Sequence, residues 1–256
     1  MTTEISDLDL RIWRGDASGG DLVSYRVPVR EGMVVLDAVL WVQSNLASDL
    51  AVRWNCKAAK CGSCSAEVDG FPRLMCKTPI AEYGSSLTVR PMKTFPLVKD
   101  LVTDVSLNYQ VNKEIPPFTP SEKDLTTSEP WRMQQKDVDR VVEFRKCIEC
   151  FLCQDVCHVL REHPKTQFYG PRYLIRVASL EMHPKDTLDR RALLKGKAGI
   201  GFCNITKCCT EVCPEHIKIT DNGIIPLKER MDDAYFDPLR WALRRLGGKK
   251  ASSEDR

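Results

Sequence analysis

Twelve cysteines constrain this chain more than any other feature, because they are gathered in three short groups. The groups run from Cys56 to Cys76, from Cys147 to Cys157 and from Cys203 to Cys213. Residues 1–10 are acidic and polar and do not show a basic and apolar signal pattern, so we expect no export and a reducing compartment in which disulfides are rare. Many thiols in such a compartment indicate metal binding rather than a disulfide framework.

The first group has the spacing C-x4-C-x2-C followed by a distant fourth cysteine. Its members are Cys56, Cys61, Cys64 and Cys76. This is the plant-type pattern of a 2Fe–2S cluster, in which one tight loop supplies three thiolates and a neighbouring segment supplies the fourth. Gly62 lies inside the loop, where a missing side chain lets backbone N–H groups approach the sulfurs. A zinc site is the alternative, but zinc usually takes its thiolates as two C-x2-C pairs.

The second group has the spacing C-x2-C-x2-C-x3-C, which is typical of bacterial two-cluster ferredoxins. Its members are Cys147, Cys150, Cys153 and Cys157. In such proteins the fourth cysteine of each run binds the cluster of the other run. The third group follows the same spacing, except that threonine stands at the second position. Its positions are Cys203, Thr206, Cys209 and Cys213, followed by Pro214.

The exchange of fourth cysteines gives the two clusters different ligand sets. One cluster takes four thiolates and is predicted to be 4Fe–4S, with the ligands Cys147, Cys150, Cys153 and Cys213. The other takes three, from Cys157, Cys203 and Cys209. The hydroxyl of Thr206 is a hard, protonated group and a poor iron ligand beside thiolate, so we predict a 3Fe–4S cluster. A four-iron cluster with an outside ligand such as water at the open corner is the alternative.

One cysteine remains outside these eleven ligands. Cys208 stands next to Cys209 and off the ligand spacing. A free cysteine often behaves as a small buried hydrophobe, so we interpret Cys208 as a buried structural thiol.

The pattern of apolar residues predicts a mixed α+β chain. Alternation and β-favouring residues predict strands at 8–13, 22–29, 65–68 and 86–89. Apolar residues at helical spacing predict helices at 34–45, 131–144, 170–180, 186–194 and 225–235. The segment 112–131 is rich in proline and polar residues, as expected for a linker. We predict domains at 1–105 and 106–240, and a basic, flexible tail at 241–256.

Several short motifs around these cysteines resemble one family, the iron–sulfur subunits of succinate dehydrogenase and fumarate reductase. They are W-N-C at 54–56, C-G-S-C at 61–64, L-M-C-K-T-P at 74–79, R-K-C-I-E-C at 145–150, G-P at 170–171 and E-V-C-P at 211–214. The resemblance covers roughly residues 8–235. It implies a β-grasp 2Fe–2S ferredoxin domain followed by an α-helical ferredoxin domain that holds the 4Fe–4S and 3Fe–4S clusters.

The resemblance also implies a function and partners. A flavoprotein subunit with covalent FAD and the dicarboxylate site would pass single electrons through 2Fe–2S, 4Fe–4S and 3Fe–4S to a haem-containing membrane anchor and quinone. We expect succinate dehydrogenase activity of the complex, with fumarate reductase as the alternative and a free ferredoxin-like carrier less favoured. This chain has no catalytic residues for dicarboxylate chemistry, and its net charge of +3 gives no reason to expect nucleic-acid binding.

The chain has no run of about 18 apolar residues. We therefore expect a peripheral protein, bound through the anchor at the cytoplasmic face of the cell membrane. At the C-terminus, five basic residues between Arg240 and Lys250 predict a solvated end, with contact to anionic lipid as the alternative.

Three positions depart from the family pattern beside the three-iron cluster. His158 stands where many members have proline, while Glu162 and Asn204 replace the tryptophan and histidine of members that build a quinone pocket there. The departures imply that this subunit does not form that pocket and resembles members with a dihaem anchor. We interpret His158 as a packed or solvated surface residue, with a proton donor near the cluster as the alternative.

Overall fold

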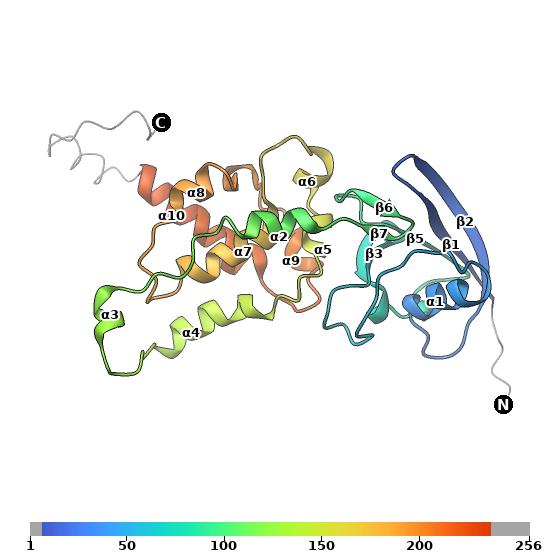
Figure 1. The fold of residues 1–256 in the computed structure, drawn as a ribbon, viewed down its shortest axis with the longest axis horizontal. Coiled ribbons are helices and arrows are strands. Elements are labelled where there is room, and N and C mark those ends of the chain that lie inside the picture. Colours follow the sequence, from blue (N-terminus) through green and yellow to red (C-terminus); the bar gives the residue numbers. More distant parts are fainter. Residues whose placement is uncertain (1–6, 237–256) are drawn as a thin grey trace.

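The computed structural model describes residues 7–236 of the chain. Figure 1 shows an elongated molecule with a β-sheet half at one end and a helical half at the other. The predicted tail at 241–256 and the basic residues from Arg240 onward lie outside the described residues.

The N-terminal half is built on a five-stranded sheet in the order β2-β1-β5-β3-β4. Its strands are β1 (Asp7–Asp16), β2 (Gly19–Pro28), β3 (Ser65–Val68), β4 (Phe71–Leu74) and β5 (Ser86–Arg90). β1 pairs antiparallel with β2 and parallel with β5. The four predicted strands are confirmed, whereas β4 and a small pair, β6 (Leu97–Lys99) and β7 (Val102–Thr103), were not predicted.

Alternation along β1 places one row of side chains in the core. Leu8, Leu10 and Ile12 are at most 1% exposed, as expected for a strand with one face against the core. The sheet packs against α1 (Val35–Asn45), whose residues Val35 and Val39 are fully buried. A mixed sheet covered by one helix in this order is the predicted β-grasp arrangement.

The C-terminal half consists of short helices and two longer ones, α7 (Gly170–Glu181) and α10 (Ile225–Phe236), of 12 residues each. The short ones are α2 (Ser106–Asn112), α3 (Glu122–Thr126), α4 (Gln135–Val142), α5 (Leu152–Asp155), α6 (His158–Glu162), α8 (Arg191–Lys195) and α9 (Cys208–Glu211). α7 is central, since Tyr173, Leu174 and Val177 on it are at most 1% exposed. The predicted helices at 170–180 and 225–235 are confirmed.

Two predicted helices are shorter than the sequence pattern indicated. α4 starts only at Gln135, and the chain continues from Glu143 to Lys146 as a 3-10 turn. Of the helix predicted at 186–194, only α8 from Arg191 forms. The preceding residues do not form a helix. The carboxylate of Asp186 accepts the N–H of Leu188 at 3.0 Å, and this bond competes with helical hydrogen bonding.

Contacts of Arg190 explain why residues 186–190 are not helical. Its side chain is 1% exposed, and its guanidinium donates to the carbonyls of Pro116 and Pro117 at 3.1 and 2.7 Å. The same group pairs with Asp186 at 2.9 Å. The predicted linker at 112–131 is therefore packed on the helical half, and it contains α3.

Candidate cluster-binding sites

Three cysteines of the first group, Cys56, Cys61 and Cys64, lie on a tight loop after α1. The loop bends at three residues in the left-handed region, Lys57, Ala59 and Gly62, with φ of 52°, 55° and 67°. As a result, the N–H groups of Ala58 and Lys60 both donate to the sulfur of Cys56 at 3.3 Å. Backbone dipoles of this kind stabilise negative charge on sulfur.

The other thiols of this group differ in their surroundings. Burial would raise the pKa of Cys61, but hydrogen bonds involving Ser63 and Cys56 outweigh burial and lower it to about 6. Cys64 is buried before β3, and burial together with its neighbours Cys76 and Cys61 raises its pKa to about 12. The β3–β4 hairpin returns the chain to Cys76 in the turn after β4. The structure thus brings these cysteines together from two separate segments.

Cys213 of the third group lies beside the second group in the folded chain. Cys153 on α5 is buried, and burial raises its pKa well above the usual range. Repulsion by Cys147, Cys150, Cys209 and Cys213 adds to this effect. Cys213 therefore lies close to the second group despite its distance in sequence. Cys153 also lies close enough to Cys209 to sense its charge, so the second and third groups are neighbours.

Two arginines place positive charge beside the second group. Glu149, between two of its cysteines, contacts the guanidinium of buried Arg172 and lies 2.6 Å from that of Arg176. One carboxylate offsets only one of the two cations. Burial raises the pKa of Cys147, while both arginines oppose that shift. The excess positive charge favours thiolates and the negative charge of a bound cluster.

Arg172 and the residue that positions its helix were not predicted from the sequence. Gly170, at the start of α7, has φ +83°, and a Cβ there would lie 2.1 Å from the buried amide of Gln154. That amide donates to the carbonyl of Tyr169 at 3.0 Å and thereby fixes the start of α7 on α5. The G-P motif at 170–171 was the available signal, but its partner lies in another helix.

The third group surrounds a small cavity of about 20 Å³. Its walls include the predicted ligands Cys157, Cys203 and Cys209, together with Thr206 and Cys208. Burial raises the pKa of Cys209 to about 12, and the charges of nearby cysteines add to this. The prediction that Cys208 is a buried structural thiol is wrong, because the thiol is only partly buried and lies 3.4 Å from the hydroxyl of Thr206. Cys208 is thus part of the cavity wall and does not fill a core.

Two of the three residues that depart from the family pattern, His158 and Asn204, meet at this cavity. The amide nitrogen of Asn204 lies 2.5 Å from Nε2 of His158, and both residues line the cavity. His158 therefore has a specific partner beside the three cysteines. Glu162 lies away from them and pairs at 3.4 Å with Lys93 on the surface.

The first and second groups meet where the two halves of the molecule touch. A Cβ added to Gly62 would lie 2.6 Å from Cα of Cys150 and 2.8 Å from its backbone nitrogen. The buried hydroxyl of Ser65 lies 2.9 Å from the carbonyl of Gly62 and 2.8 Å from that of Cys150. Lys60 pairs with Glu215 at 3.0 Å across the same boundary. The two ligand loops are therefore in direct backbone contact.

A buried charged cluster, which the sequence did not reveal, lies at the same boundary. Glu67 on β3 is 5% exposed and lies 2.8 Å from the guanidinium of Arg161 on α6. Asp155 on α5 is fully buried and accepts the N–H of Thr94 at 3.1 Å. Burial and repulsion by Asp155 raise the pKa of Glu67 to about 7, although Arg161 opposes the shift.

The donor set fits iron–sulfur clusters. All twelve cysteines are free thiols within residues 7–236, and four of them line the cavity of the third group. Thiolate is the ligand that iron–sulfur clusters require. Burial raises the pKa of Cys150 to about 12, so metal binding must release a proton that the buried thiol would otherwise keep.

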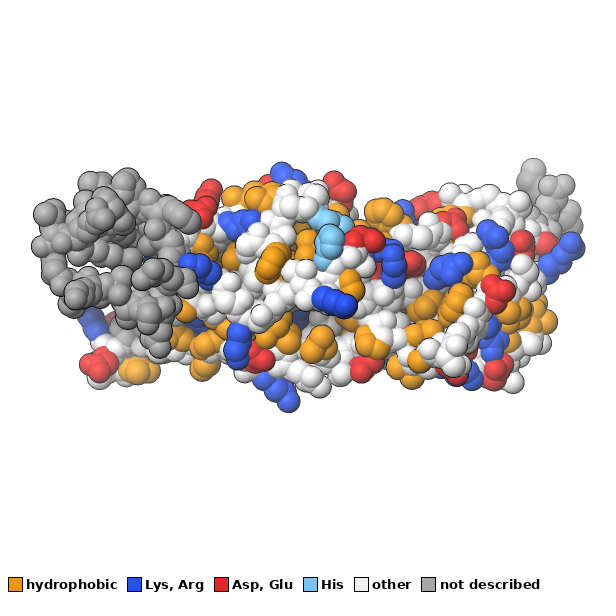
Figure 2. All heavy atoms as spheres, turned by 90° about the horizontal axis from the view of Figure 1, so that it is seen from above, with side chains coloured by type: hydrophobic (Ala, Val, Ile, Leu, Met, Phe, Trp, Pro, Cys, Tyr) orange, Lys and Arg blue, Asp and Glu red, His pale blue; other side chains and the backbone are white. Residues whose placement is uncertain are grey.

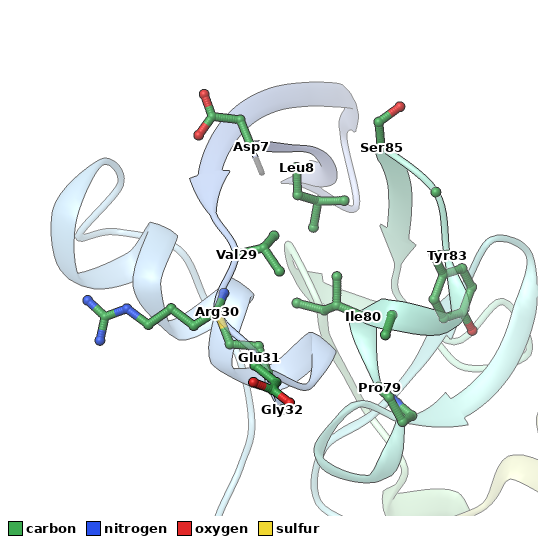
Figure 3. Close-up of a pocket in the computed structure, with 13 residues that line it drawn as sticks. Asp7, Leu8, Val29, Arg30, Glu31, Gly32, Pro79, Ile80, Tyr83 and Ser85 are labelled. Carbon is green, nitrogen blue, oxygen red and sulfur yellow. The ribbon is translucent and has the colours of Figure 1, made fainter. Parts of the chain in front are cut away.

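A groove elsewhere on the surface contains none of these cysteines. It has a volume of about 830 Å³ and lies between the start of β1 and the segment after Cys76. Figure 3 shows Leu8, Val29 and Ile80 lining it. On the face drawn in Figure 2, acidic and basic side chains are interspersed with apolar ones. Within the described part of the chain, no helix is long and apolar enough to cross a membrane.

Comparison with known proteins gives matches over both halves. The family described as "2Fe-2S iron-sulfur cluster binding domain" matches residues 9–110, and the "4Fe-4S dicluster domain" matches residues 143–217. The fumarate reductase iron-sulfur subunit of Haemophilus influenzae is 30% identical over 209 residues, which cover 77% of this chain and 81% of that protein. The succinate dehydrogenase iron-sulfur subunit of Bacillus subtilis is 27% identical over 206 residues, with 77% and 81% covered.

A solved structure is more similar still. A chain of the Mycobacterium smegmatis Sdh1 complex in the apo form has a TM-score of 0.88 and 58% sequence identity to this chain. The match covers 92% of this chain and 99% of that one. The two matched family ranges contain all eleven cysteines predicted as ligands.

Proposed function

This chain belongs to the family of iron–sulfur subunits of fumarate reductase and succinate dehydrogenase, and from that premise we propose which residues hold its clusters and which partners its electrons connect. Its function is electron transfer within a complex of this type, through 2Fe–2S and 4Fe–4S clusters in the two matched domains. The chain itself supplies no dicarboxylate chemistry in this proposal, and each cluster accepts or gives one electron at a time.

The proposed ligands are the eleven cysteines of the three groups. The 2Fe–2S cluster takes Cys56, Cys61, Cys64 and Cys76, whose spacing is the plant-type one. The 4Fe–4S cluster takes Cys147, Cys150, Cys153 and Cys213. Support for including Cys213 comes from its electrostatic influence on Cys150 and Cys153, both of which lie near it in the folded chain.

The third cluster is proposed to be 3Fe–4S, held by Cys157, Cys203 and Cys209. All three cysteines line one small cavity, with Thr206 at the position where a fourth ligand would be expected. A protonated hydroxyl competes poorly with thiolate for iron, so the corner beside Thr206 holds no iron in this proposal.

The contact between Gly62 and Cys150 is the observation that carries the proposed route. A Cβ added to Gly62 would lie 2.6 Å from Cα of Cys150, so the loop of the first cluster contacts a proposed ligand of the second. Cys153 and Cys209 then connect the second group to the third, since each lies near enough to affect the other's charge. The order of the three groups in space therefore supports electron transfer between neighbouring clusters in the order 2Fe–2S, 4Fe–4S and 3Fe–4S.

The proposed partners follow from the two ends of this route. A flavoprotein subunit with FAD delivers electrons to the 2Fe–2S cluster, and a haem-containing membrane anchor takes them from the 3Fe–4S cluster toward quinone. The chain would then lie peripherally at the cytoplasmic face of the membrane, with residues 1–105 and 106–240 as its two domains. Because the protein from Haemophilus influenzae is a fumarate reductase subunit, transfer in the opposite direction is the second candidate.

Purification of the intact complex tests the cluster inventory. Metal analysis should give about nine irons per chain and no zinc if all three clusters are present. Electron paramagnetic resonance of the air-oxidised complex should show a three-iron signal. Zinc in place of iron, or spectra without any three-iron centre, would overturn the assignment.

A second measurement tests the direction of the reaction. The rates of succinate oxidation and of fumarate reduction are compared in the same membranes, with ubiquinone and menaquinone analogues as acceptors for the first reaction and the corresponding quinols as donors for the second. We expect succinate oxidation to be faster. A higher rate of fumarate reduction with both quinones would favour the second candidate.

A further inference from the structure

Cys208 is a thiol that the proposed cluster set does not use, although it lies in the wall of the third cavity. The cavity also contains Cys157, Cys203 and Cys209. Cys208 therefore lines the same small cavity as all three proposed ligands.

The position of Cys208 also brings it beside the corner that lacks a thiolate. Its sulfur lies 3.4 Å from the hydroxyl of Thr206, which occupies the fourth ligand position of the sequence pattern. Cys208 is only partly buried, so an ion from solution can reach it. The two side chains therefore occupy the same end of the cavity.

Packing does not explain why a cysteine stands at position 208, as a comparison of the second and third cysteine groups shows. Cys208 begins α9 after Lys207, which has φ +64°, and Leu152 begins α5 after Phe151, which has φ +61°. Each precedes a proposed ligand by one residue. Leu152 is 2% exposed and belongs to the core of the N-terminal half, whereas Cys208 belongs to none of the hydrophobic cores within the described residues.

We propose that Cys208 is a reserve ligand that completes a four-iron cluster when ferrous ion is available under reducing conditions. This inference rests on the proposed three-iron cluster, because a cluster that already held four irons would have no open corner. Cys208 would replace Thr206 as the group facing that corner. The same site would then exist in two forms that differ by one iron and one iron–thiolate bond.

The reaction balances with groups that the proposal names. The three-iron cluster first takes one electron from the normal electron-transfer route. A ferrous ion then enters, an iron–sulfur bond forms to Cys208, and the S–H bond breaks with release of one proton to water. No further oxidant or reductant is required, since the entering iron is already ferrous. Proton release from the thiol is the usual companion of metal binding to cysteine.

Iron uptake by the purified complex tests the proposal. The complex is reduced anaerobically with succinate and dithionite, incubated with ferrous ammonium sulfate, freed of unbound iron and reoxidised. The wild-type complex should gain one iron and lose its three-iron paramagnetic resonance signal, because an oxidised four-iron cluster of this type is diamagnetic. The Cys208→Ala complex should gain no iron and keep the signal.

Two controls separate this proposal from the cluster assignment itself. Before treatment, wild-type and Cys208→Ala complexes should show equal three-iron signals; a missing signal in the wild type would refute the proposed cluster and not only the role of Cys208. The Thr206→Ala complex should still take up iron. Three results would each overturn the proposal. They are equal iron uptake by the wild-type and Cys208→Ala complexes, iron uptake that depends on Thr206 instead, and no iron uptake by the wild-type complex.

Discussion

Replacement of Gly62 by alanine probes the contact between the two halves of the molecule. The added Cβ would lie 2.6 Å from Cα of Cys150, while carbon atoms in favourable contact are about 3.5–4.0 Å apart. The alanine Cβ has a fixed position on its Cα, and the atom that it meets belongs to the backbone, so no side-chain rotation relieves the contact. The two ligand loops must separate by about 1 Å to restore normal contact.

The cost of this change has two parts. Alanine in the left-handed region is less favourable than glycine by about 1–2 kcal/mol, and Gly62 has φ +67°. The overpacked contact adds about 1–3 kcal/mol. Gly70 is the matched control, since it has φ +77° and a Cβ there would meet nothing within 4 Å. The Gly70→Ala variant therefore carries only the first part.

Calorimetry of the intact complex measures the difference between the two variants. The Gly62→Ala complex should unfold about 2–12 °C below the Gly70→Ala complex, given about 2–4 °C per kcal/mol for a chain of this size. Reduction of the 4Fe–4S cluster by succinate in a single turnover should also become slower in Gly62→Ala alone. Equal unfolding midpoints and equal reduction rates in both variants would refute the close contact.

Three further variants test the chemistry of the sites. Cys209→Ser should remove the three-iron paramagnetic resonance signal of the isolated complex while Cys208→Ser keeps it, and the reverse result would contradict the ligand register. Thr206→Cys should supply a fourth thiolate, raise the iron content by one and abolish the same signal, so an unchanged iron content would refute the account of the open corner. Glu67 has a folded-state pKa of about 7 against an ordinary 4.5. Between these two pH values the folded chain binds more protons than the unfolded chain, so the free energy of unfolding decreases as pH rises. In unfolding curves measured across this pH range, Glu67→Gln should lose the decrease in the free energy of unfolding, which is on the order of 3 kcal/mol. If the decrease keeps its size, its source is Asp155 and not Glu67.

Most of the fold could be predicted where the signals in the sequence are local. The alternation at residues 8–13 predicted β1, and the helical spacing at 34–45 predicted α1. The short elements α5, α6 and α9 have only four or five residues, which is less than the span over which a helical period can be recognised. α5 and α9 each begin after a residue in the left-handed region, Phe151 and Lys207.

The helix predicted at 186–194 failed for a different reason. The apolar pattern there is compatible with a helix, but Arg190 is buried against the carbonyls of Pro116 and Pro117. These partners lie more than seventy residues away in the sequence. A contact of that range overrides the local preference, and no pattern within the segment indicates it.

The sequence by itself determined the number of cysteine groups and the kind of cluster that each is predicted to hold, because ligand spacing is a local property of the backbone. Only the tertiary structure decided that Gly62 touches Cys150, that Glu67 faces Asp155 in a buried boundary, and that Cys208 shares a cavity with the third group. Each of these depends on the distance between segments that are remote in the chain. Such distances are set by packing of the two halves, and therefore no spacing along the sequence could reveal them.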